Sequence, residues 1–441
     1  MSKRSWRFVF VGIAIICLPR LPSLLAQSQL HNILFPIFLG LTLGRLLPGI
    51  RTSFPGSLHD EPGPRHAGYF TLGLIALMLI VSLLSIFQYA DAQGSLSNRV
   101  LLPGMSTHYA MFLAATLSLN LLAPLLWISS ERIAAPQDLS GTGRGPKAVP
   151  IDPAQVANAL LFGITLGVVA YCLSAVGQGS IPVLNAGIAD HGLEVGRLPG
   201  LFSDSGASGV LLPSVLMMAS IWLSPGRRTV SASLFLIAFL LLMPFQGRVI
   251  WLGLLGVLLA LPFCFKQLHL SPRPLILGVF LFASFLIVIL FLKRYNLLDT
   301  RVTFEAMQSV DSVRSALIEW SLEIFWKSPW IGHGLNSFIP QLMELKSIHP
   351  EIYPENSPGF IPGVLTDLGL LGYCAVVLLL GRYLRLLAQT MSTPAFGHIH
   401  VRALAFLPIA LAPTFLVGYH ILHPEVAAFV LLPLLIVPPG R

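Results

Sequence analysis

Charged residues are scarce in this chain of 441 residues, and their scarcity excludes most classes of protein. Asp, Glu, Lys and Arg make up only 10% of the chain, whereas 55% of its residues are apolar. A soluble globular chain carries about 25% charged residues, because most of its surface must meet water. Together with a mean hydropathy of +0.78, this shortage excludes a soluble enzyme, a secreted disulfide scaffold and a disordered protein. It indicates an all-α, polytopic integral membrane protein.

Cysteines and cofactor motifs are also few. The four cysteines all lie within apolar stretches, where cysteine behaves as a small buried hydrophobe: Cys17, Cys172, Cys264 and Cys374. The sequence has no His-Glu-x-x-His motif, no P-loop and no Rossmann glycine motif, so we expect no metal and no cofactor, and an ATP-driven transporter is disfavoured. The net charge of +8 has no soluble basic domain to carry it, so nucleic acid is not an expected partner.

Long apolar runs predict about twelve transmembrane helices. A run of about 20 apolar residues can cross the hydrocarbon core of a bilayer. The runs lie near residues 8–26, 31–48, 69–90, 108–129, 156–177, 206–224, 229–246, 249–265, 274–292, 359–381, 402–419 and 421–438. Pro19 and Arg20 interrupt the first run, which we interpret as a retained, kinked helix; the alternative is a signal peptide with a basic start.

Basic residues provide an independent test of this topology, since cytoplasmic loops carry an excess of Lys and Arg. With the N-terminus in the cytoplasm, 17 of the 27 basic residues fall on the inner side, and both termini are then cytoplasmic. The chain divides into nine spans over residues 1–292, a large outer loop over 293–358 and three spans over 359–441.

The large outer loop has a mixed polar surface, with six basic and eight acidic residues. Within it, residues 312–327 carry apolar side chains at helical spacing, namely Val313, Leu317, Trp320, Ile324 and Phe325. This pattern is typical of an amphipathic helix, which we expect to lie across the outer membrane surface.

Two arginines on the outer side are the first candidates for a functional site, because charges at membrane level are costly. Arg197 lies just before the sixth run, and Arg248 lies at the tip between the seventh and the eighth. An arginine fork binds phosphate oxygens bidentately and keeps its charge at any working pH, so the pair suits a diphosphate. Alternatively, each arginine extends to the membrane interface or pairs with a carboxylate, such as Asp204 for Arg197.

The outer loop also offers groups for proton transfer or acceptor binding: His333, His349, Glu355 and Asn356. Histidine titrates near neutral pH, and a carboxylate can act as a base when desolvation raises its pKa. A lone histidine in a loop is more often a surface or capping residue, so both interpretations stand at this point.

One segment of the outer loop resembles the bacterial O-antigen ligases and polymerases. Residues 314–338 read RSALIEWSLEIFWKSPWIGHGLNSF. The corresponding family segment has an Arg, an amphipathic helix, a Pro and then a Gly-x-Gly-x-x-x-Phe turn. Here that turn consists of Gly332, Gly334 and Phe338, and it follows Pro329.

Three further segments occur in the family's order, so the resemblance covers roughly residues 190–385. GRLPGLFSDSGASG around Arg197 looks like the family's Arg motif, and QGRV at Arg248 looks like its hairpin tip. ENSPGFIPGVLTDLGLLG, residues 355–372, is similar to the stretch that leads into the next span and ends in Gly-x-x-Gly.

One departure from the family concerns the catalytic base. Where the ligases have His-Asn, this chain has Pro358-Gly359, and Glu355-Asn356 lies three residues earlier. Either Glu355 replaces the histidine, or His349 reaches the same place, or the chain belongs to a subfamily that lacks this base. The loss favours a polymerase over a ligase.

The resemblance implies a multi-pass protein of the bacterial inner membrane, with its active site at the periplasmic face. It implies transfer of a glycan from a polyprenyl-diphosphate donor to a hydroxyl of an acceptor glycan, with inversion and without metal. The implied partners are these two glycans, membrane lipids and a possible chain-length regulator protein. The implied roles are diphosphate binding by Arg197 and Arg248, proton removal by Glu355 or His349, and substrate binding by Arg314, His333 and Asn356. Arg314 would clamp a phosphate or glycan, or anchor the amphipathic helix.

Our first interpretation is therefore a polymerase of a surface polysaccharide, such as O-antigen, capsule or exopolysaccharide. The second is a ligase that passes the finished glycan to a lipid or protein acceptor. A lipid-linked glycan flippase or transporter is a third, and it predicts charges in the middle of spans. Asp367 alone fits that description, since the other charged residues within the runs lie toward their ends.

Overall fold

The computed structural model describes residues 3–17, 77, 80, 152–178, 205–225, 227–242, 249–265, 304–334, 337–338, 341–342, 359–391, 394–416, 418 and 424–435. Within these ranges the regular elements are helices, and no strand occurs, which confirms the all-α class for this part of the chain. The α-helices are α1 (Lys3–Cys17), α7 (Pro153–Gln178), α9 (Ser205–Leu223), α10 (Arg228–Leu242), α11 (Val249–Cys264), α13 (Phe304–Lys327), α15 (Phe360–Thr390), α16 (Ile399–Ala405), α17 (Leu407–Leu411) and α18 (Pro424–Leu431). The 3-10 helices are η7 (Pro394–Gly397), η8 (Ala412–Leu416) and η10 (Leu432–Leu435).

Helices lie where the first, the fifth to eighth and the tenth to twelfth spans are predicted. Two stretches, Pro153–Ser174 and Phe360–Arg385, are long and apolar enough to cross a membrane, and Ile399–Ala405 with Leu407–Leu416 is a third if this pair, bent by 46°, is one span. These helices are consistent with a membrane protein. The runs 31–48, 108–129 and 274–292 lie outside the described residues, as does 69–90 apart from Leu77 and Ile80. The total of twelve spans stays a prediction.

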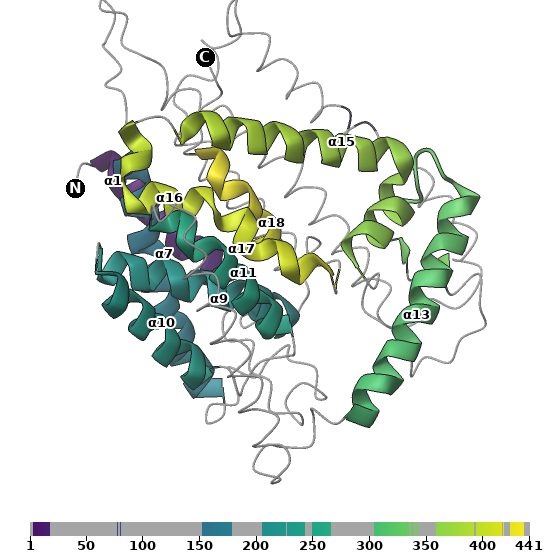
Figure 1. Cartoon of the computed structure of the whole chain (residues 1–441), viewed down its shortest axis with the longest axis horizontal. Helices are drawn as coiled ribbons and strands as arrows, with labels where there is room; N and C mark the ends of the chain where they lie inside the picture. Colours follow the sequence, from purple (N-terminus) through teal and green to yellow (C-terminus); the bar gives the residue numbers. More distant parts are fainter. Residues whose placement is uncertain are drawn as a thin grey trace, which may run out of the picture.

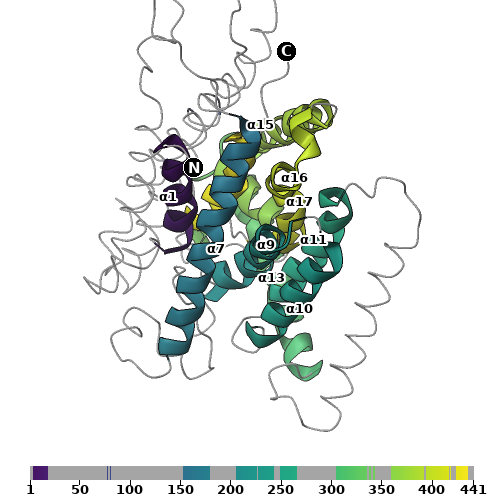
Figure 2. The same cartoon turned by 90° about the vertical axis from the view of Figure 1, so that its left-hand side faces the viewer.

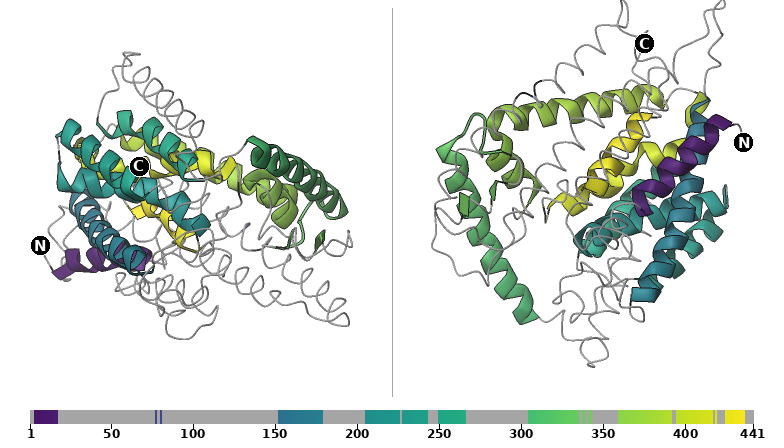
Figure 3. Two further views of the ribbon diagram at one scale, coloured as in Figure 1. Left: turned by 90° about the horizontal axis from the view of Figure 1, so that it is seen from below. Right: turned by 180° about the vertical axis from the view of Figure 1, so that it is seen from behind.

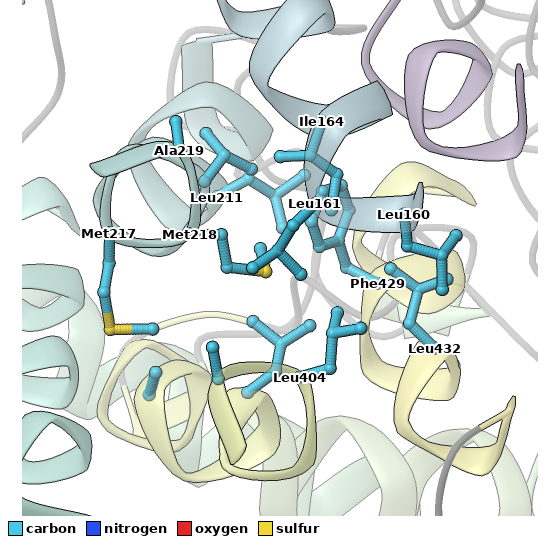
Figure 4. Close-up of a cluster of buried hydrophobic side chains, with 14 of the residues drawn as sticks. Leu160, Leu161, Ile164, Leu211, Met217, Met218, Ala219, Leu404, Phe429 and Leu432 are labelled. Carbon is cyan, nitrogen blue, oxygen red and sulfur yellow. The ribbon is translucent and has the colours of Figure 1, made fainter. Parts of the chain in front are cut away.

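Helices α7, α9 and α11 form the centre of the described fold, and α16, α17 and α18 pack against them (Figures 1 and 2). Each central helix is apolar on all sides, as expected of a helix surrounded by other helices or by lipid. Figure 4 shows buried side chains from four of these elements, among them Leu161 of α7, Met218 of α9, Leu404 of α16 and Phe429 of α18.

Two glycines allow α1 and α7 to approach to backbone contact. A Cβ atom on Gly163 would overlap the carbonyl oxygen of Val9, and a Cβ atom on Gly12 would lie 2.5 Å from the carbonyl oxygen of Leu160. Small residues at such crossings are characteristic of helices in membranes, where close packing replaces the hydrophobic effect between helices. Helix α1, which includes residues 8–17 of the first predicted span, is therefore part of the core of the described fold.

A buried arginine caps the C-terminal end of α11. The last carbonyls of a helix have no partner within it, so they need donors from elsewhere. Arg402 of α16 donates from Nε to the carbonyl of Cys264 at 2.6 Å, and from Nη1 to the carbonyls of Phe396 and Gly397, both at 2.8 Å. Arg228 donates to the carbonyl of the residue that follows α11, at 3.0 Å. Arg402 thus joins α16 to α11 and η7 through backbone groups, and Arg228 joins α10 to α11.

Helix α13 lies at the edge of the described fold, beside the first turns of α15 (Figure 1; Figure 3, left). The pattern predicts that this helix begins at residue 312, but in the structure it already begins at Phe304. Its end at Lys327 agrees with the prediction. The face that carries the predicted amphipathic pattern is turned inward. A small cluster of buried side chains lies beneath it, formed by Leu317, Ile324, Phe338 and Leu342. This face therefore packs on protein.

Candidate functional site

Helix α15 is interrupted at Gly369, and the candidate site is built around this interruption. Gly369 has φ 63° and ψ −167°, a conformation that is essentially restricted to glycine. In a continuous helix the amides of Leu370 and Leu371 would donate to the carbonyls of Thr366 and Asp367. The interruption leaves these four backbone groups in need of other partners, because an unpaired buried polar group is costly.

The turn from Pro329 to Gly334, which follows α13, supplies all four partners. The hydrogen bonds are His333 N–H to Thr366 O (3.0 Å), Gly334 N–H to Asp367 O (2.9 Å), Leu370 N–H to Pro329 O (2.8 Å) and Leu371 N–H to Trp330 O (3.1 Å). Two bonds within α15 are thus replaced by four bonds between the turn and the helix. We call this arrangement the turn–kink junction.

Glycines on both sides make the turn–kink junction possible. Gly332 has φ 69°, and a Cβ atom there would overlap the carbonyl group of Asp367. A Cβ atom on Gly369 would lie 2.5 Å from the carbonyl carbon of Trp330 and 2.6 Å from the nitrogen of Gly332. Both glycines belong to the segments that carry the family resemblance. The described residues of 314–338 and of 359–372 therefore form one structural unit.

Asp367 is the charged group at the junction, and it is fully buried. Its Oδ1 accepts hydrogen bonds from the backbone amide of Ser337 at 3.3 Å and from the Ser337 hydroxyl at 3.2 Å. A buried carboxylate needs such donors to replace the water that it loses. Asp367 therefore ties the residues after the turn to the interruption in α15.

Thr366 and Ser321 join α13 to α15 through a second polar contact. The hydroxyl of Thr366 lies 2.8 Å from the carbonyl oxygen of Pro362 in its own helix and 3.3 Å from that of Ser321 in α13. The Ser321 hydroxyl donates to the carbonyl of Leu317, at 2.8 Å. The two helices thus share polar contacts as well as the apolar cluster beneath α13.

His333 caps the end of α13. Its Nε2 lies 2.9 Å from the carbonyl oxygen of Ile324, which has no partner within the helix because it belongs to the last turn. In the tautomer that carries the proton on Nε2, His333 donates this hydrogen bond. The half-buried ring therefore sets the angle between α13 and the turn. Its predicted role in substrate binding stays a prediction.

Most of the other predicted site residues lie outside the described residues: Arg197, Arg248, His349, Glu355 and Asn356. For Arg314 the structure describes only the backbone, one turn before Leu317 in α13. Leu342 and Gly359, which flank the segment with His349 and Glu355, are both buried in the described fold. The unit of α13 and α15 therefore anchors both ends of that segment.

Asp367 is the residue of the junction to which the sequence assigned no role. It stood out as the charged residue in the middle of an apolar run. Ser337, which donates to its carboxylate, lies 30 positions away in the chain and becomes a neighbour only after folding. No local pattern in the sequence could have paired them.

The turn–kink junction can position the segments joined to it, but it does not itself present a reacting group, because its carboxylate is enclosed. Asp367 is 0% exposed, so it offers no atom to a substrate. Among the residues that the structure describes, no group of three or more His, Cys, Asp or Glu side chains could hold a metal ion. The hydrogen-bonded connection joins α13 to a helix that is apolar and long enough to span a membrane.

No protein-family model matches this sequence, and no curated protein matches it. The implications of the resemblance therefore stay predictions.

Proposed function

We propose that this chain is a membrane glycosyltransferase that joins polyprenyl-diphosphate-linked oligosaccharide repeat units into a surface polysaccharide. The observation that supports this proposal is the turn–kink junction. Residues 314–338 and 355–372 resemble segments of the O-antigen polymerases and ligases, and their described parts meet there through four backbone hydrogen bonds and two glycines. The glycines that carry the resemblance are thus residues that the contact between the two segments requires.

A lipid-linked donor also needs an enzyme that works at the membrane surface. The described helices are apolar, and Phe360–Arg385 is long enough to cross a bilayer. The junction connects this helix directly to α13, which lies beside its start. Groups carried by the neighbouring loop would thus be held at the level where the diphosphate of a polyprenyl lipid lies. We assign this level to the periplasmic face of the inner membrane.

In the proposed reaction an acceptor hydroxyl attacks the anomeric carbon of the donor glycan. The new bond joins the acceptor oxygen to this carbon, while the bond from the carbon to the diphosphate oxygen breaks. The polyprenyl diphosphate leaves with the bonding electrons, and the hydroxyl proton passes to a base. Direct displacement inverts the anomeric centre, and the lipid diphosphate is already an activated leaving group.

Arg197 and Arg248 are the residues that we propose for binding the departing diphosphate. Its negative charge grows in the transition state, so a fixed guanidinium stabilises the transition state more than the ground state. Glu355 or His349 would accept the proton. Both belong to the segment that is anchored between Leu342 and Gly359.

The decisive experiment incubates the purified full-length protein, reconstituted in vesicles, with lipid-linked repeat units and separates the products by size. A ladder of longer lipid-linked glycans is expected for a polymerase. Transfer to an added lipid core or protein acceptor would indicate the ligase instead. Absence of turnover with an intact lipid donor would exclude both activities.

The site assignment is tested by Arg197→Ala and Arg248→Ala in the same assay. Each change should lower the rate about 100-fold or more, which is typical for loss of a group that stabilises charge in a transition state. Arg227→Ala is a matched control, because Arg227 is an exposed arginine outside the proposed site. Wild-type activity in the Arg197 and Arg248 variants would remove both residues from the site.

A further inference from the structure

Helix α13 and the turn after it carry a second apolar face, which points away from the protein. It consists of Ile318, Leu322, Trp326 and Trp330, whose side chains are 41%, 42%, 71% and 66% exposed. We call these residues the α13 stripe. The first three are four positions apart, so at about 100° per residue they stay on one side of the helix. A stripe that ends in two exposed tryptophans is unusual for a surface in contact with water.

The α13 stripe lies between two faces of different character. On one side is the buried face, which includes Leu317 and Ile324. On the other side are the exposed charged residues Glu319, Glu323 and Lys327, each four positions from the next. Helix α13 therefore has one face on protein, one apolar face outside and one charged face outside.

The α13 stripe is continuous with an exposed apolar surface of α15. The carbonyl of Trp330 accepts a hydrogen bond from the amide of Leu371, so the stripe reaches α15 at the turn–kink junction. From there, exposed apolar side chains follow α15 along its length, including Leu370, Leu371, Val377, Leu378, Leu380 and Leu384. Since α15 is apolar and long enough to span a membrane, lipid is the natural cover for this surface.

The directions of the two helices agree with this continuity. The part of α15 after Gly369 is its long part. Figure 1 and the right-hand view of Figure 3 show α13 crossing at one end of this long part, instead of running beside it. If the long part of α15 spans a bilayer, then α13 lies along the surface of that bilayer. An interfacial helix of this kind combines an apolar face toward lipid with a charged face toward water.

We propose that the α13 stripe is a lipid-contacting surface, with Ile318 and Leu322 against acyl chains and the two tryptophans at the headgroup boundary. Tryptophan is enriched at this boundary because its ring is apolar and its N–H is polar. Glu319 and Glu323 then face water. The proposal does not depend on the proposed enzymatic function, since it concerns only where α13 lies.

Spin labels on neighbouring positions test this placement in the full-length protein. The labels are attached to Ile318→Cys, Leu322→Cys and Trp326→Cys on the stripe, and to Glu319→Cys, Glu323→Cys and Lys327→Cys as matched controls. The four native cysteines are first replaced by serine. The protein is reconstituted in phosphatidylethanolamine and phosphatidylglycerol vesicles, and collision rates with oxygen, which partitions into lipid, and with a water-soluble nickel chelate are measured.

The ratio of oxygen to nickel collisions is expected to exceed unity at 318, 322 and 326 and to fall below unity at 319, 323 and 327. High nickel collision rates at the stripe would show that it faces water and would overturn the proposal. Low collision rates with both reagents would show that protein covers the stripe, either another part of this chain or a second copy of it. This result would also overturn the proposal. Each variant is also checked for folding by size-exclusion chromatography.

Discussion

The turn–kink junction predicts a specific response to the substitution Gly369→Ala. Alanine would place its Cβ atom 2.5 Å from the carbonyl carbon of Trp330, and the native φ of 63° strains any residue with a side chain. The variant can therefore adopt one of two structures. Either the strained junction persists, or α15 closes into a continuous helix and the turn detaches.

Each of the two outcomes has a cost. Keeping the native φ and ψ of Gly369, which are essentially restricted to glycine, costs alanine about 1–3 kcal/mol, before the overlap with Trp330 is added. Closing α15 loses the four bonds to the turn and regains two helical bonds, a net loss of two bonds worth about 1 kcal/mol each. The bonds from Ser337 to Asp367 weaken as well. We expect the junction to lose about 2–4 kcal/mol, or about 30- to 1000-fold in its opening equilibrium.

Hydrogen exchange measured by mass spectrometry separates these outcomes. In Gly369→Ala the peptide containing the amides of His333 and Gly334 should exchange faster by this factor. The amides of Leu370 and Leu371 should stay protected, because a continuous helix satisfies them. Gly381→Ala is the matched control in the same helix, since a Cβ atom there has no neighbour within 4 Å. It should leave exchange in the turn unchanged.

Wild-type protection of His333 and Gly334 in a folded Gly369→Ala protein would contradict this prediction, because the turn would then be held by something other than this junction. Equal effects of Gly369→Ala and Gly381→Ala would refute it too, since a general loss of helix stability would explain both.

Two further predictions concern the core. Arg402→Met removes donors from three backbone carbonyls, including that of Cys264, and should cost about 3 kcal/mol or more. This loss should be measured as a lower Tm in detergent. Arg385→Met should change Tm little, because Arg385 is exposed. Gly163→Leu drives a side chain into the backbone of α1 at Val9 and should cost about 1–3 kcal/mol or more by overpacking. Leu173→Ala, also in α7, should be nearly neutral, because the Leu173 side chain is 71% exposed. Equal Tm values for the two variants would contradict the close approach of α1 and α7.

The positions of many helices follow from the sequence because hydrophobic runs of this length have few alternatives to a helix. An apolar segment buried in other helices or lipid must satisfy its backbone groups internally. The expected runs at 156–177, 206–224 and 249–265 accordingly coincide closely with α7, α9 and α11. The run at 402–419 differs, because the structure bends it by 46° between α16 and α17, where Pro408 follows the first residue of α17.

The surroundings of α13 were beyond the reach of sequence patterns. Helical spacing identified Leu317 and Ile324 as apolar neighbours, but the same spacing also links Ile318, Leu322 and Trp326. Periodicity shows which residues share a face, and it does not show what covers that face. Only the position of Phe338 and Leu342 in the fold distinguishes the inner face from the outer one.

The scarcity of charge was enough to predict an all-helical membrane protein, because too few charges are available to cover a soluble surface, and the regular elements of the described residues are indeed helices. The resemblance also singled out the glycines of the 332–334 turn and of 369–372. What those glycines do became visible only in the fold, since contacts between residues far apart in the chain depend on the packing of whole helices. It brought Gly332 against Asp367 and Gly369 against Trp330. A charged residue that looked out of place in an apolar run is thereby explained as a buried acceptor that holds Ser337, after the α13 turn, to a candidate membrane span.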